Sequence, residues 1–257
     1  MRGVLWAKVT GPLVGLWLVL HGPRLPGSMP PQPAPELPLL LGGVLLAGGL
    51  ILLVAALGVL LTPEVAPPKI IGEPGQRPGL RLYLASTAAV LGVSLLLEAV
   101  AGAAGFGQDG ELGRMQRTFS ALGLGERAWT ALVIGLAPAF TEEIAFRGWV
   151  LSRIAAASGP RVAVAFSAAA FGIFHFDPAH AAVTTAMGLV LGMATVRTGA
   201  LGPAIVAHAV NNGLGVTTAG ASLGGFGWMG LAGLGLGLGV WGTATVLTET
   251  QARPQRT

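Results

Sequence analysis

The longest uncharged run constrains the fold of this chain more than any other feature. Residues 37–61, LPLLLGGVLLAGGLILLVAALGVLL, carry no charge over 25 residues, and a helix needs only about 20 apolar residues to cross a bilayer. Charged residues make up 10% of the chain, against roughly 25% in soluble domains. The sequence therefore predicts an all-α protein that crosses a membrane several times.

Further apolar runs, separated by charged or Pro/Gly-rich breaks, raise the predicted number of spans to about eight. The predicted spans are 4–21, 37–61, 82–104, 128–152, 161–176, 180–196, 203–219 and 224–247. The breaks at 22–36, 62–81 and 105–127 are predicted loops. The first run begins like a signal peptide, but no A-x-A-like cleavage site follows it, so we expect a retained helix.

The basic residues predict the orientation. With a cytoplasmic N-terminus, four of the 15 Lys and Arg fall in outer loops and Arg147 lies within a span. The cytoplasmic segments hold the others, namely Arg2, Lys8, Lys69, Arg77, Arg81, Arg153, Arg161, Arg197, Arg253 and Arg256. The positive-inside rule therefore places both termini in the cytoplasm, and we expect the cell membrane as the location.

Charge and cysteine content narrow the function classes. The 15 Lys and Arg are scattered and stand against 11 Asp and Glu, which argues against a nucleic-acid surface. The absence of cysteine excludes disulfides, thiolate metal sites and a cysteine nucleophile.

Three predicted spans carry polar side chains at bilayer depth, where each ionisable group costs a few kcal/mol and is functional by default. These are Glu142, Glu143 and Arg147 in the fourth span, His175, four residues after Phe171, in the fifth, and His208 and Asn212 in the seventh. Glu143 and Arg147 are four residues apart and share a helix face, whereas Glu142 is turned by about 100°. We therefore expect Glu143 to pair with Arg147 and Glu142 to face water and His175.

The depths of these groups allow one common site. Along their helices, Glu142 lies about 16 Å from Arg153, and His175 about 21 Å from Arg161, if both arginines mark the cytoplasmic surface. His208 lies about 8 to 16 Å from the start of its helix. Pro138, four residues before Glu142, cannot donate its helical hydrogen bond and could open this span to water or substrate.

The polar set suits peptide hydrolysis. A carboxylate and an imidazole that share a water can deprotonate it for attack on a carbonyl, which suits Glu142 with His175. A second imidazole beside a carboxamide can donate to the resulting oxyanion, which suits His208 with Asn212. No cofactor is required by this assignment. Zinc held by Glu142, His175 and His208 stays open, although no HExxH motif is present.

Other readings remain for the same groups. They could relay protons in a transporter or stabilise a non-catalytic scaffold, with Glu143 and Arg147 as a neutralising pair.

Polar residues outside the set have simpler explanations. Asp177 precedes Pro178 and fits a helix N-cap. His21 and His180 fall at span ends, where an interfacial place is expected. For Glu98 two roles stay open, pairing with an arginine or lining the cavity. Gly233 with Gly237, and Gly235 with Gly239, predict tight packing of the last span.

The three motifs resemble a known family, the CAAX-processing and bacteriocin-processing (CPBP, or Abi) membrane proteases, related to type 2 CAAX prenyl proteases. Its pattern of EExxxR, FxxxH and HxxxN on successive membrane helices matches residues 142–147, 171–175 and 208–212. The resemblance implies an intramembrane endopeptidase with about eight helices and a buried polar active-site cavity. Its substrate would be a peptide or membrane protein, with or without a lipid group.

The resemblance also implies residue roles. By motif position, Glu142 and His175 would activate water and His208 and Asn212 would form the oxyanion hole, with Glu143, Arg147 and Phe171 in support. We therefore expect N-terminal helices and loops over 1–127, a catalytic core over 128–218, and a last helix with a short cytoplasmic tail over 219–257.

Overall fold

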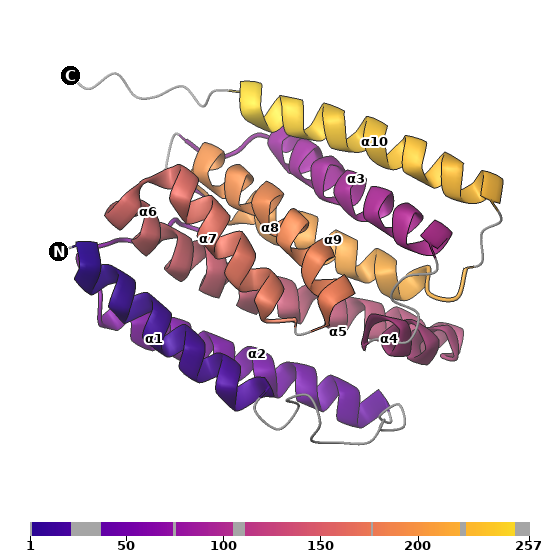
Figure 1. The fold of residues 1–257 in the computed structure, drawn as a ribbon, viewed down its shortest axis with the longest axis horizontal. Coiled ribbons are helices and arrows are strands. Elements are labelled where there is room, and N and C mark those ends of the chain that lie inside the picture. Colours follow the sequence, from indigo (N-terminus) through magenta and orange to yellow (C-terminus); the bar gives the residue numbers. More distant parts are fainter. Residues whose placement is uncertain are drawn as a thin grey trace.

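The computed structural model describes residues 2–21, 37–73, 76–104, 111–175, 177–221 and 225–249, and these residues form helices and connections without a β-strand (Figure 1). The elements are α1 (Arg2–His21), α2 (Leu37–Leu60), α3 (Leu80–Ala104), α4 (Glu111–Ser120), α5 (Leu124–Glu143), the π-helix η2 (Ile144–Leu151), α6 (Ser152–Ser158), α7 (Pro160–Ile173), α8 (Pro178–Thr198), α9 (Gly202–Thr217) and α10 (Gly225–Thr248). The predicted all-α class is confirmed.

Six stretches of the described residues are long and apolar enough to cross a membrane. They are Gly3–Leu20, Leu37–Leu60, Leu80–Ala104, Leu124–Ser158, Pro178–Thr198 and Gly227–Thr248. All eight predicted runs are helical, but α7 has 14 residues and α9 has 16. Helices of this length reach only about 21 and 24 Å, short of a hydrocarbon core about 30 Å thick. The chain is thus an integral membrane protein with six candidate spans instead of the predicted eight.

The predicted loop over 105–127 is wrong over most of its described part, because Glu111–Ser120 forms α4 and α5 already begins at Leu124. Residues 105–110 lie outside the described residues. In α4 the apolar Met115 and Phe119 are four apart and pack into one core cluster, while the rest of the helix is largely polar. A short amphipathic helix contains no continuous apolar run, so the criterion used to find spans overlooks it.

The helices form three groups side by side (Figure 1). One group is α1 with α2, another is α3 with α10, and α5 to α9 lie between them. Three side chains fasten α1 to the bundle: Trp6 Nε1 donates to Ser158 Oγ, Lys8 Nζ to the Leu61 carbonyl and Trp17 Nε1 to the Ile173 carbonyl. The expected helix over 4–21 is therefore present and packed.

Arg153, expected to mark the cytoplasmic surface, is fully buried among the helices. Its Nε donates to Thr62 Oγ1 at 2.9 Å and its Nη1 to the Gly148 carbonyl at 3.3 Å. Because Thr62 lies two residues after the end of α2, this arginine ties that end of α2 to the π-helix.

Glycines bring α3 and α10 into backbone contact. A Cβ atom on Gly92 would collide with the backbone of Gly239 and the carbonyl oxygen of Gly235. Gly233 and Gly237 have no atoms within 4 Å of a Cβ position. The packing prediction is therefore confirmed for the Gly235 and Gly239 pair and wrong for Gly233 and Gly237.

We expect Gly92→Ala to destabilise the protein by about 1–3 kcal/mol, because the added methyl meets backbone atoms that cannot rotate away. The matched control is Gly233→Ala, where the position is open and alanine has the higher helix propensity. Unfolding by SDS titration from mixed micelles measures both. Equal stability of the two variants would contradict the glycine contact.

Candidate active site

A change of helix type marks the place of the first motif. Glu142 and Glu143 are the last residues of α5, and Arg147 lies in η2, whose residues from Ala145 to Leu151 are all buried. A π-helical turn within a longer helix is often found at functional sites. The three charged side chains thus lie deep in the bundle instead of at a helix end.

Glu143, Arg147 and His208 form one buried cluster. Arg147 Nη1 donates to Glu143 Oε1 at 2.8 Å, and both side chains are 0% exposed. His208 Nδ1 lies 2.9 Å from the same oxygen, so α9 is joined to the first motif through Glu143. The predicted Glu143–Arg147 pair is present, and its link to His208 was not predicted.

The two adjacent glutamates have different surroundings, as expected from their angular separation. The Glu142 side chain is 18% exposed and contributes to a pocket, whereas Glu143 is fully buried and does not. Glu142 Oε2 lies 3.8 Å from His208 Nε2. Glu142 is therefore the carboxylate that a molecule in the pocket can reach.

Phe171 and Gly188 complete the support for Arg147. The guanidinium carbon lies 4.5 Å from the centre of the Phe171 ring, a cation–π arrangement. Arg147 Nη2 donates to the Gly188 carbonyl at 3.3 Å. A side chain on Gly188 would press against Ala168 and the same guanidinium nitrogen. Arg147 is thus held from η2, α7 and α8 together.

The His175 ring is oriented by the last turn of α7, the helix that it follows. Its Nδ1 lies 2.9 Å from the Phe171 carbonyl, four residues earlier. A carbonyl only accepts, so Nδ1 carries the hydrogen, and in the neutral ring Nε2 has the lone pair. This is the tautomer that a general base or a water acceptor requires.

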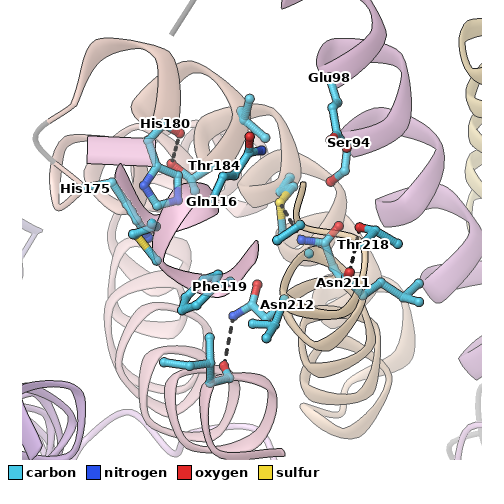
Figure 2. Close-up of a pocket in the computed structure, with 18 of the residues that line it drawn as sticks. Ser94, Glu98, Gln116, Phe119, His175, His180, Thr184, Asn211, Asn212 and Thr218 are labelled. Carbon is cyan, nitrogen blue, oxygen red and sulfur yellow. Dashed lines mark hydrogen bonds between the residues drawn. The ribbon is translucent and has the colours of Figure 1, made fainter. Parts of the chain in front are cut away.

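His180 lies beside His175, with ring centroids 4.4 Å apart at an interplanar angle of 63°. Both rings line the pocket (Figure 2). Asp177 accepts from the His180 backbone N–H, which confirms the predicted N-cap of α8. His180 lies in the first turn of α8, at a span end as predicted, and its ring also lines the pocket; the His21 side chain lies outside the described part.

We expect His180→Ala to lower kcat by about 2- to 12-fold, the equivalent of an aromatic contact of 0.5–1.5 kcal/mol. The loss of the ring frees the His175 ring to rotate. His180→Phe keeps a ring in that place and should restore most of kcat. Steady-state kinetics of both variants measure the effect, and an unchanged kcat in His180→Ala would rule out this positioning role.

Asn212 is placed by a carbonyl that a proline leaves unpaired. Pro138 has no N–H to donate to the Ile134 carbonyl one turn earlier. Asn212 Nδ2 lies 3.5 Å from that carbonyl oxygen, a long hydrogen bond (Figure 2). The carboxamide nitrogen carries two hydrogens, so one remains for another acceptor.

One pocket collects the four residues named as catalytic candidates. It has a volume of about 1180 Å³ and is lined by Glu142, His175, His208 and Asn212 from α5, the turn after α7, and α9. α2, α3, α4, α8, Trp228 of α10 and the turn after α9 also contribute to its wall. In Figure 2, His175 and His180 lie on one side, and Asn211 and Asn212 on another.

The described side chains do not form the three-ligand zinc site that Glu142, His175 and His208 could have provided. No three His, Asp or Glu side chains among the described residues gather closely enough to hold a metal ion. His208 Nδ1 is engaged by Glu143.

Residues 124–214 match the family model described as Type II CAAX prenyl endopeptidase Rce1-like. This segment is similar to the Rce1-like family. It runs from α5 into α9 and contains all three motifs, so the resemblance read from them is confirmed. No match was found among curated proteins or among solved structures. The match to this family suggests a protease with a peptide or protein substrate in a membrane environment.

Proposed function

We propose that this Rce1-like protein is an intramembrane endopeptidase that hydrolyses a peptide bond of a membrane-associated or lipidated protein. The observation that carries the proposal is the shared pocket, which Glu142, His175, His208 and Asn212 all line. These side chains come from α5, the turn after α7 and α9, in a bundle that is otherwise mostly apolar. Their convergence favours a chemical role over three unrelated packing roles.

Glu142 and His175 activate the attacking water. Glu142 is the carboxylate open to the pocket, and His175 offers Nε2 to the same space. A water between them gives its proton to Glu142 as its oxygen attacks the carbonyl carbon. Glu142 then passes that proton to the leaving amine as the C–N bond breaks, so the carboxylate is regenerated.

His208 and Asn212 stabilise the oxyanion. His208 Nδ1 bonds to Glu143, so the ring turns its Nε2 toward Glu142 and the pocket, the side from which it would donate to the oxyanion. Asn212 adds its second amide hydrogen from one turn further along α9. Donors that are held before the reaction begins stabilise the developing charge without having to reorganise. Glu143 and Arg147 act here by holding His208.

The proposal also includes the domain boundaries and the orientation of the chain in the membrane. Residues 128–218 form the catalytic core, 1–127 and 219–257 flank it, and both termini face the cytoplasm of a cell membrane. Because the chain has no cysteine, single cysteines introduced near either terminus can report the side of the membrane. If an impermeant maleimide added outside intact cells labelled these terminal cysteines, the proposed cytoplasmic location of the termini would be wrong.

A comparison of membrane proteomes tests the enzyme class. Membranes that contain the intact protein are compared with membranes that contain Glu142→Ala or His175→Ala, and new protein termini are sequenced. We expect termini that only the intact protein produces. Identical termini in all three samples, with similar amounts of folded protein, would overturn the proposal.

The same preparations separate the rival functions. Solute or proton flux in liposomes that depends on Glu143 and Arg147, without proteolysis, would indicate a transporter. Loss of folded protein without loss of turnover per molecule would indicate a scaffold role for the motifs. Stoichiometric zinc that is essential for cleavage would overturn the metal-free assignment.

A further inference from the structure

Glu98 is an ionisable side chain in a membrane-spanning helix that the proposed mechanism does not use. It lies in α3, is exposed, and lines the pocket together with Glu142. The other charged residue of α3, Arg81, is 17 positions away and pairs with Glu249. Within the described part of the chain, no hydrogen bond or ion pair reaches Glu98. Its carboxylate is thus open to whatever enters the pocket.

Other polar groups gather around the same part of the wall. Ser94, four residues before Glu98, points from the same face of α3, and its buried hydroxyl has no partner (Figure 2). Gln116 of α4 and Asn211 of α9 also line the pocket. Hydrogen-bond acceptors therefore accompany the carboxylate, as a bound donor group would require.

We propose that Glu98 and Ser94 form a recognition subsite for a basic side chain, lysine or arginine, of the peptide substrate. The inference rests on the proposed protease function and adds a substrate class to it. A carboxylate in a pocket with apolar walls attracts a cation more strongly than one in bulk water, because the local dielectric constant is lower. The hydroxyl of Ser94 can accept a second N–H from the same group.

The pocket is large enough for this arrangement. Its volume is about 1180 Å³. This exceeds the roughly 300–1,000 Å³ that is typical of small-molecule sites, so the pocket has room for a short peptide segment. The wall also carries Arg117 of α4, which has interactions of its own. A basic substrate group near Glu98 would leave the reacting carbonyl to Glu142 and His208.

A binding experiment tests the subsite without proteolysis. The probe is n-octylamine, a cation at neutral pH with an apolar tail, and octanol is its uncharged control. Thermal stabilisation of the full chain by each probe is measured for the intact protein, for Glu98→Gln and for Glu73→Gln. Glu73 is a surface residue paired with Lys69, which makes it a matched glutamate control.

We expect n-octylamine to stabilise the intact protein and Glu73→Gln, with an apparent Kd about tenfold or more weaker for Glu98→Gln. Octanol should not distinguish the three proteins. Equal n-octylamine affinity for all three would overturn the subsite. Because this readout needs no cleavage, it separates failure of the subsite from failure of the protease function.

A cleavage experiment tests the substrate class. Peptides are built on a cleavage site found in the proteome comparison, with each Lys or Arg replaced in turn by norleucine. We expect one replacement to lower kcat/KM about tenfold or more for the intact protein and to have little effect on Glu98→Gln. Equal losses in both proteins at every position, or cleavage sites without basic residues, would overturn the inference.

Discussion

Glu142→Gln is expected to lower kcat by about 10²–10⁴-fold, the range that a general base contributes, while the protein remains folded. Glutamine has nearly the same size and keeps a carbonyl oxygen in the pocket, but it cannot accept a proton from water. Glu142 forms no hydrogen bond within the described residues and is only near His208, so little packing is lost. Turnover of a substrate peptide by purified protein measures the effect.

Glu126→Gln is the control for that measurement, because Glu126 belongs to the same helix and serves as the capping residue of its first turn. It should leave kcat close to that of the intact protein. If Glu142→Gln kept a kcat within a few fold of the intact protein, the water-activating role of Glu142 would be wrong. The neighbouring Glu143 would then be the first residue to reconsider.

Arg147→Ala is expected to destabilise the protein by about 3–5 kcal/mol, because it leaves the buried Glu143 carboxylate without its cation. Arg147 is fully buried and contacts Glu143, the Gly188 carbonyl and the Phe171 ring. Arg147→Lys keeps the charge but loses the planar guanidinium with its several N–H donors, so we expect an intermediate loss of stability. SDS titration from mixed micelles measures the free energy of unfolding for each variant.

The double variant Glu143→Gln, Arg147→Met separates charge from packing. Removing both charges together avoids an unpaired buried ion, so stability should recover most of the loss seen in Arg147→Ala. Activity should stay low, since His208 then donates to a neutral carbonyl instead of a carboxylate. A double variant as unstable as Arg147→Ala would show that the pair acts mainly through packing.

Contacts within one helix could be predicted from the sequence with good success. The Glu143–Arg147 pair and the alignment of Phe171 with His175 follow from a spacing of four residues. The N-cap at Asp177 follows from the Asp-Pro pair at a helix start. In each case the two partners are joined by a few covalent bonds of known geometry, so spacing decides which side chains meet.

Contacts between helices could not be predicted in the same way. The order of the motifs suggested that Glu142 would face His175, but it did not reveal that His208 would bond to Glu143. Nor did it place His180 against His175 or bring Glu98 and α4 to the pocket wall. A rotation of α9 by one residue, about 100°, would turn His208 away from the cluster.

The number and kind of polar groups, the membrane setting and the family follow from local patterns, because hydrophobicity and helical spacing act over neighbouring residues. The assembly of the site depends on helix packing, which is set by the fit of side chains far apart in the chain. Gly92 against Gly239 and Arg153 against Thr62 are two such contacts. No single helix contains the information for either, so the positions of His180, Glu98 and α4 around the pocket emerge only when the bundle is formed.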